Sequence, residues 1–158
     1  AAICDPELTL GLPPLLTAAT GMDAIAHCLE TFMAPAVNPP ADGIGLDGLE
    51  RGWANIERAT RNGSDREARW QMMSASMQGA MAFQKGLGAM HSLSHPCSAN
   101  LGTHHGLANA VVMPYVLVWN REALEEKMMR PAAWLGRTHR SFGRVLQWSL
   151  HLRSELGT

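Results

Sequence analysis

Apolar residues recur at the spacing of an amphipathic helix along most of the chain, and no stretch after residue 5 alternates as a strand would. Short segments rich in proline, glycine and asparagine separate these periodic runs. The pattern therefore predicts an all-α fold. The predicted helices cover residues 14–34, 41–60, 65–84, 89–96, 104–118, 121–135 and 141–156.

Local start and stop signals set several of these boundaries. Ser64 is a candidate N-cap with Glu67 at capping-box spacing, and Thr103 is a candidate N-cap for a later helix. Pro96 is expected to end the helix before it, and Pro131 is expected to kink or shorten the helix that contains it, because an interior proline costs about 3 kcal/mol.

The helix predicted for residues 65–84 is rich in methionine and small residues. We interpret it as a buried helix with close neighbours, because methionine stripes usually belong to the core. The chain starts on a short apolar run, residues 1–4, that ends at Asp5 and Pro6. We interpret that run as the last strand of an upstream domain, and the chain as a fragment.

Composition narrows the functional class. The 158 residues suffice for one domain with a core, and 46% of them are hydrophobic. A net charge of −1 with scattered Lys and Arg argues against nucleic-acid binding. No apolar run approaches the ~20 residues that span a membrane. Three cysteines without a CxxC pair indicate reduced thiols in a cytoplasmic protein.

Five of the seven histidines cluster in two short stretches, residues 21–30 and 86–113. The other two, His139 and His151, are interpreted as solvated surface residues. An isolated Asp/His pair four residues apart is common and seldom binds metal. The clustering of several such groups is what indicates a metal site here.

The spacing within the cluster fits helices. Asp23 and His27 are four residues apart, as are His91 and His95, so each pair lies on one helix face. His105 begins the next predicted helix and can fold back over the first. One carboxylate and several imidazoles form a mixed ligand set that suits Fe²⁺ or Zn²⁺ better than Mg²⁺ or Ca²⁺.

The chain contains the segments DPELTLGLPPLLTAATGMDAIAHCLE, GLGAMHSLSHP and THHGLANAVVMP, at residues 5–30, 86–96 and 103–114. These three segments resemble one family, the iron-containing (group III) alcohol dehydrogenases. Together they span nearly the whole chain and both signature regions of the family. The resemblance implies that a catalytic divalent metal, usually Fe²⁺ and in some relatives Zn²⁺, has four protein ligands: Asp23, His27, His91 and His105.

The same resemblance implies that His95 lies near the substrate and the nicotinamide without binding the metal. It implies a homodimer in which an N-terminal nucleotide-binding α/β domain holds NAD or NADP. Residues 1–158 would then be the helical C-terminal domain of this dehydroquinate synthase-like fold, with the first domain missing. The expected reaction interconverts an alcohol with an aldehyde or ketone by hydride transfer, and His95 is expected to relay the alcohol proton.

Some features leave alternatives open. The segment 97–102 departs from the family pattern and changes the expected substrate-side wall. His104 should point away from the site. Thr17, Thr20 and Gly21 are candidates for close packing beside Asp23 or for supporting that ligand, and core packing is the favoured role. The alcohol stays open, from small primary alcohols and diols to short hydroxy acids such as 4-hydroxybutyrate. A zinc-dependent glycerol dehydrogenase, a dehydroquinate synthase-like lyase and an inactive helical metal-binding domain are the competing interpretations.

Overall fold

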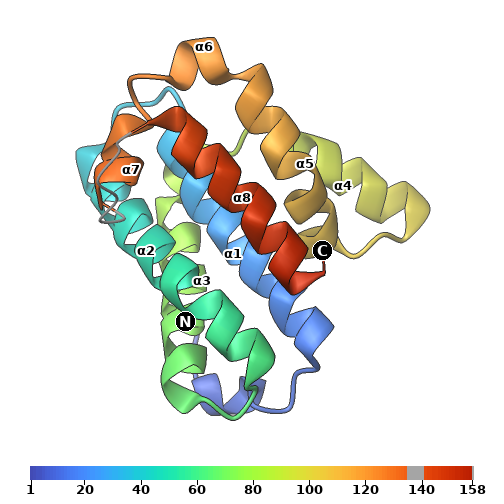
Figure 1. The fold of residues 1–158 in the computed structure, drawn as a ribbon. Helices are drawn as coiled ribbons and strands as arrows, with labels where there is room; N and C mark the ends of the chain where they lie inside the picture. Colours follow the sequence, from blue (N-terminus) through green and yellow to red (C-terminus); the bar gives the residue numbers. More distant parts are fainter. Residues whose placement is uncertain (135–140, 158) are drawn as a thin grey trace.

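Helix α1, Pro14–Met33, is the central element of the fold in the computed structural model, which describes residues 1–134 and 141–157. It packs against α2, Pro39–Arg61, and α3, Arg66–Met81, on one side and against α5, His105–Trp119, on another (Figure 1). Most of its residues are buried, as expected for a helix that is apolar around most of its circumference.

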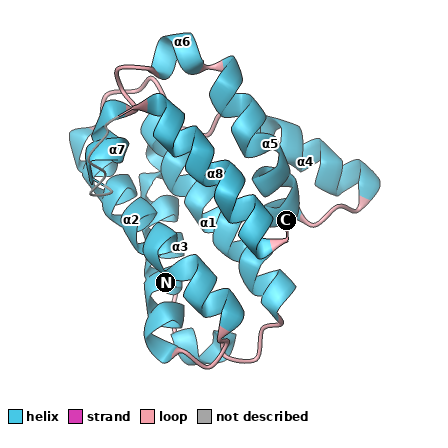
Figure 2. Ribbon diagram, in the orientation of Figure 1, coloured by secondary structure: helices cyan, strands magenta, loops and turns pink. Residues whose placement is uncertain are grey.

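The described residues contain helices and loops and no strand, so the predicted all-α class is confirmed for them (Figure 2). The remaining elements are the 3₁₀ helices η1, Pro6–Thr9, and η2, Ala82–Lys85, and the helices α4, Ala89–Leu101, α6, Arg121–Leu124, α7, Met129–Trp134, and α8, Phe142–Leu156.

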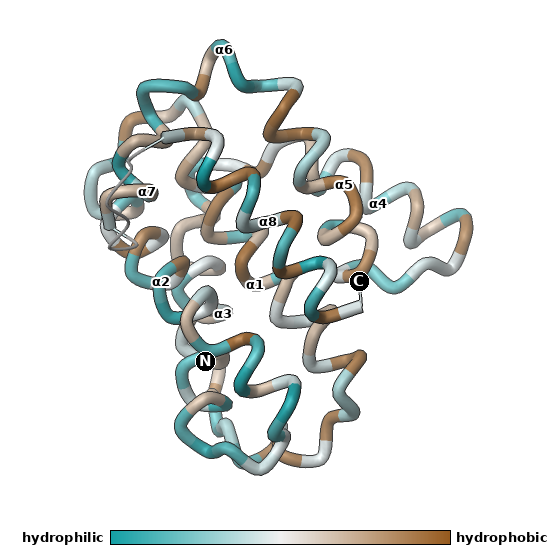
Figure 3. The backbone as a smooth tube through the Cα atoms, viewed as in Figure 1, coloured by the Kyte–Doolittle hydropathy of each residue, from teal (hydrophilic) through white to brown (hydrophobic). Residues whose placement is uncertain are grey.

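Helix α8 packs against α2, α5 and α7 and completes the core. Its buried side chains include Phe142, Val145 and Leu152, at the spacing of one helix face. Figure 3 shows hydrophobic residues along α5 and a mixture of hydrophobic and hydrophilic residues along α8. Among the described residues, no helix combines the length and the apolar character that crossing a bilayer requires.

Three predicted features of the helix ends are wrong: one C-terminal end and two N-caps. Helix α4 does not end near Pro96 but continues to Leu101, so residues 97–101 are helical rather than a loop. Pro96 and Ser92 are both exposed, and water can satisfy the Ser92 carbonyl that loses its helical donor. The N-caps are Asp65, whose carboxylate accepts from the backbone N–H of Ala68, and His104, in place of Ser64 and Thr103.

The break expected within residues 121–135 is confirmed, and it lies before Pro131. Helix α6 ends at Leu124 and α7 begins at Met129. Pro131 is the third residue of α7, where its missing N–H needs no helical partner. The predicted end at residue 135 lies outside the described residues.

Residues 1–5 have no regular secondary structure here, and the described chain offers no second strand to pair with them. That residues 1–4 are the last strand of an upstream domain stays a prediction. The interpretation of the methionine-rich helix is corrected. Helix α3 is only partly buried: Met72 and Met73 are half-buried, while Met77 and Met81 are exposed. Apart from Arg69, its buried positions are small residues such as Ala75 and Gly79, which let α3 lie close to its neighbours.

Candidate metal centre

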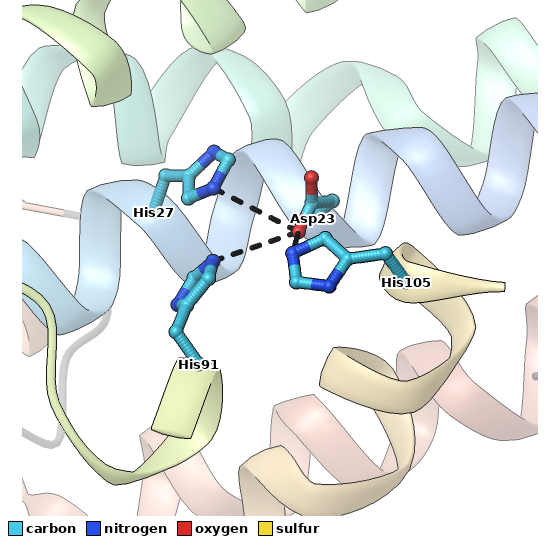
Figure 4. A group of neighbouring side chains, drawn as sticks. All are labelled: Asp23, His27, His91 and His105. Carbon is cyan, nitrogen blue, oxygen red and sulfur yellow. Dashed lines mark ion pairs between the residues drawn. The ribbon is translucent and has the colours of Figure 1, made fainter. Parts of the chain in front are cut away.

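Four side chains from three helices converge on one point (Figure 4). Asp23 and His27 project from α1, His91 comes from the first turn of α4, and His105 is the first residue of α5. The Oδ1 atom of Asp23 lies 3.8 Å from Nε2 of His27, 3.7 Å from Nε2 of His91 and 3.5 Å from Nε2 of His105. One ligand atom from each residue lies within 4.8 Å of all the others.

These separations fit a divalent transition metal. Ligand bonds of about 2.1 Å in tetrahedral geometry place neighbouring ligand atoms about 3.4 Å apart, close to the distances observed from Asp23. Three imidazoles and one carboxylate are also the donor types that Fe²⁺ and Zn²⁺ prefer. The cluster is enclosed on one side and open on the other, because the side chain of His91 is 2% exposed and that of His105 is 32% exposed.

Close helix packing brings the ligands together. Gly106, next to His105, lies over the backbone of Ala19 on α1, and a Cβ built there would meet the Ala19 oxygen at 2.1 Å. Gly79 on α3 has the same role beside His27, since its Cβ would lie 2.8 Å from the His27 Cβ. Glycine at these two positions lets α5 and α3 approach α1 closely enough to form the cluster.

Glu30 supports His91 from the side opposite the cluster. Its Oε2 atom lies 2.6 Å from Nδ1 of His91, and the two side chains are 1% and 2% exposed. The carboxylate also accepts hydrogen bonds from the backbone N–H groups of Met90 and His91. His91 therefore presents Nε2 to the other ligands.

Asn109 contacts the cluster from α5. Its Nδ2 atom donates to Oδ1 of Asp23 at 2.7 Å and lies 3.2 Å from Nε2 of both His91 and His105. The amide is fully buried. Asn109 therefore joins the Asp23 carboxylate to the two histidines from the α5 side.

Burial and neighbouring charges shift the pKa values of the four clustered side chains. Burial lowers the pKa of His27 and of His105. Burial also opposes the charged form of His91, but the carboxylates of Asp23 and Glu30 outweigh it and raise the pKa of His91 to about 9. The pKa of Asp23 lies below its usual value because the nearby His91, His27 and Asn109 outweigh the effect of burial.

His95 lies at the edge of the cluster. Its ring is exposed and stacks on the His105 ring, with 5.1 Å between the centroids. His104 is exposed and caps α5 through the backbone N–H of Leu107, so it lies outside the cluster, as predicted. His151 is exposed as expected, whereas His139 lies outside the described residues.

The threonines near Asp23 act in packing. Thr17 accepts a hydrogen bond from Arg69, and Thr20 donates to the carbonyl of Leu16. Gly21 makes room for the side chains of Ile56 and Met72. Neither threonine side chain makes a hydrogen bond to a ligand side chain among the described residues.

Sequence reasoning missed Glu30 and Asn109 as neighbours of the ligands. Both carry a helical signal: Glu30 follows His27 by three residues, and Asn109 follows His105 by four. That spacing places each on the ligand-bearing face of its helix. Which ligand each would contact depends on how α1, α4 and α5 pack.

The sequence of this chain matches a known protein family and a curated relative. Residues 17–146 match the family described as Fe-containing alcohol dehydrogenase family, C-terminal. A 4-hydroxybutyrate dehydrogenase of Cupriavidus necator is 73% identical over 127 residues, which are 77% of this chain and 33% of that enzyme. This chain thus spans about a third of the length of that curated relative.

Solved structures agree. A 1,3-propanediol oxidoreductase superposes with a TM-score of 0.91 at 33% identity, covering 97% of this chain and 42% of that one. A sulfoacetaldehyde reductase from Bifidobacterium kashiwanohense, solved in complex with NAD⁺, gives 0.89 at 25% identity and covers 98% and 41% of the two chains. By its sequence and its fold, the chain belongs to the iron-containing alcohol dehydrogenase family.

Proposed function

We propose that this chain is the metal-bearing part of an NAD(P)-dependent alcohol dehydrogenase. The observation that carries the proposal is the convergence of one carboxylate and three imidazoles, from helices far apart in the sequence, within 4.8 Å. We assign the ligand role to Asp23, His27, His91 and His105, with Fe²⁺ or Zn²⁺ as the ion. The nucleotide would be held by a second, N-terminal domain.

The chemistry follows from the open side of the cluster. An ion held there would supply a Lewis acid for the oxygen of an alcohol or a carbonyl group. The buried face, formed by His91 and Glu30, keeps water away from one side of the ligands. The exposed face, beside His105, is the side from which a small substrate would reach the ion.

His95 is our proposed proton relay. It is exposed and stacks on His105, so it lies between the open side of the cluster and solvent. An imidazole in this position can accept the proton that an alcohol loses on oxidation and pass it to water. It does so without being a ligand.

The substrate we propose is a short hydroxy acid such as 4-hydroxybutyrate. Support comes from the 73% identity to the Cupriavidus necator 4-hydroxybutyrate dehydrogenase. Family relatives near 38% identity carry other names, including an NAD-dependent methanol dehydrogenase of Bacillus methanolicus and a 1,3-propanediol dehydrogenase of Citrobacter freundii. The expected homodimer stays a prediction.

A hybrid enzyme tests the proposal. The 127 matched residues of the Cupriavidus necator enzyme would be exchanged for those of this chain, and the hybrid would be loaded with Fe²⁺ or Zn²⁺ without oxygen. We expect reduction of NAD⁺ or NADP⁺ with 4-hydroxybutyrate, faster than with 1,3-propanediol or methanol. Asp23→Ala in the hybrid should abolish it, while the exposed control Glu50→Gln should leave it unchanged.

The outcomes separate the competing functions. Faster turnover of a diol than of the hydroxy acid would overturn the substrate assignment and keep the reaction class. A folded hybrid that binds one metal and oxidises none of these alcohols would contradict the dehydrogenase proposal and favour a helical metal-binding domain without this activity.

A further inference from the structure

We propose that Glu30 is a positioning residue that keeps His91 protonated at Nδ1, so that Nε2 is the atom available to the metal. This inference rests on the metal centre of the proposed function. It does not depend on which alcohol is oxidised. It assigns a role to a buried carboxylate that makes no hydrogen bond or ion pair with the other three ligands in the described structure.

The contact itself defines the protonation. A carboxylate accepts hydrogen bonds and donates none, so the Nδ1 atom 2.6 Å from Glu30 Oε2 must carry a hydrogen. Both side chains are almost completely buried, at 1% and 2% exposure, so water cannot take the place of either partner. The other ring nitrogen, Nε2, faces Asp23 at 3.7 Å.

Glu30 is itself held in place by the start of α4. The first N–H groups of a helix have no partner inside the helix. Oε1 of Glu30 accepts the N–H of Met90 at 2.6 Å, and Oε2 accepts that of His91 at 3.3 Å. Gly88 has no side chain to cap this turn, so the carboxylate from α1 acts as the cap.

Gly88 also makes the approach possible. A Cβ built on Gly88 would lie 2.9 Å from Oε1 of Glu30, so a larger residue would displace the carboxylate. The backbone of α4 therefore fixes Glu30, and Glu30 fixes the ring of His91. One side chain couples the position of α4 to the protonation of a ligand.

An amide cannot replace this carboxylate. The two oxygens of Glu30 meet only donors: two backbone N–H groups and Nδ1–H of His91. Glutamine has one oxygen and one NH₂ group. Its NH₂ group would either face the N–H of Met90, donor against donor, or donate to Nδ1 of His91. The second arrangement moves the proton to Nε2, where a metal must displace it.

The test compares Glu30→Gln with the matched control Glu50→Gln, an exposed glutamate on α2. Zinc affinity is measured by competition with a chromogenic chelator, and helix content by circular dichroism. We expect Glu30→Gln to keep its helix content and to bind Zn²⁺ about 10- to 100-fold more weakly. The control should bind as the unchanged chain does. Equal affinities of Glu30→Gln and the unchanged chain would overturn the assignment.

A second measurement needs no variant at residue 30, and so decides the matter if Glu30→Gln does not fold. In the zinc-loaded chain with ¹⁵N-labelled histidine, NMR reports which ring nitrogen of His91 carries hydrogen, and His91→Gln identifies the signal. We expect a proton on Nδ1 and zinc on Nε2. Zinc on Nδ1 would overturn the inference. If this result holds while the hybrid oxidises no alcohol, the proposed function fails and the role of Glu30 stands.

Discussion

Gly106 of α5 rests directly on the carbonyl group of Ala19 in α1: a Cβ at Gly106 would lie 2.1 Å from the Ala19 oxygen. The next residue toward the N-terminus is His105, which reaches Asp23 on the same helix as Ala19. A close approach of α5 to α1 thus lies beside the candidate metal centre, and the geometry of the centre depends on it.

Gly106→Ala should therefore damage both stability and metal binding. The added methyl group meets backbone, which cannot move aside as a side chain could, so α5 must shift and carry His105 with it. We expect the free energy of unfolding to fall by about 1–3 kcal/mol and zinc affinity to fall with it. Urea unfolding and chelator competition measure the two effects.

Gly43→Ala is the matched control. Gly43 is exposed within α2, and no atom lies within 4 Å of the position that an added methyl group would take. Alanine there should stabilise the helix by about 1 kcal/mol. Equal stability of Gly106→Ala and the unchanged chain would show that α5 does not need glycine for its approach to α1.

Without metal, the stability of the chain should fall as pH rises from 6.5 to about 9. The pKa of His91 is raised in the folded chain, against burial, to about 9 from an ordinary value of 6.5 by the charges of Asp23 and Glu30. The charged His91 ring therefore adds to the free energy of unfolding. This stabilisation is fully present below pH 6.5 and is lost as the pH rises through about 9. Urea unfolding in the presence of a chelator at several pH values measures it.

Metal affinity should change in the opposite direction over the same range. A metal at Nε2 of His91 displaces a proton, so zinc affinity should rise with pH up to about 9. The exposed-residue variant His151→Gln should show both trends. Stability and affinity that do not change across this range would rule out a charged His91 in the folded, metal-free chain.

The pair formed by Lys85 and Asp42 should be essential for stability. The Lys85 side chain is fully buried and donates to Asp42 and to the carbonyl oxygen of Phe32. Asp42→Asn leaves a buried charge without its partner, and we expect a loss of about 3–5 kcal/mol. Adding Lys85→Met removes that charge and should recover part of the loss in urea unfolding. A double variant less stable than Asp42→Asn would contradict this.

Arg69 should stabilise the chain by joining two loops to α1. It is 3% exposed and donates to the carbonyl oxygens of Gly63 and Leu12 and to Oγ1 of Thr17. Arg69→Met removes all three bonds, and we expect a loss of about 2–4 kcal/mol. The exposed Arg66 is the control.

Arg66 pairs with Glu7 at the surface, so Arg66→Met should change stability by less than about 1 kcal/mol. Both variants would be compared by thermal or urea unfolding. Similar losses for the buried and the exposed arginine would show that the contacts of Arg69 contribute little.

The pairing of Asp23 with His27 needed only local information, whereas the set of four ligands came from the family resemblance. Asp23 and His27 share a face wherever residues 14–34 are helical, and α1 covers 14–33. The helix positions were predicted well for the same reason, since apolar periodicity depends on neighbouring residues. His95 could not be distinguished from His91 by spacing alone, and only the family resemblance separated them.

The wrong predictions depend on the surroundings of each residue. Pro96 does not end α4 because the helix is exposed there and water can satisfy the freed carbonyl. Met77 and Met81 are exposed because α3 packs through its small residues instead. Glu30 meets His91 across 61 positions, so no local pattern pairs them.

The central claim is that Asp23, His27, His91 and His105 hold one metal ion. The most direct measurement is anaerobic loading with Fe²⁺, removal of unbound ion, and metal analysis of the chain beside its Asp23→Ala and His151→Ala variants. We predict about one ion per chain, lost in Asp23→Ala and kept in His151→Ala. A folded chain that binds no ion, or an Asp23→Ala variant that keeps its ion, would contradict the account.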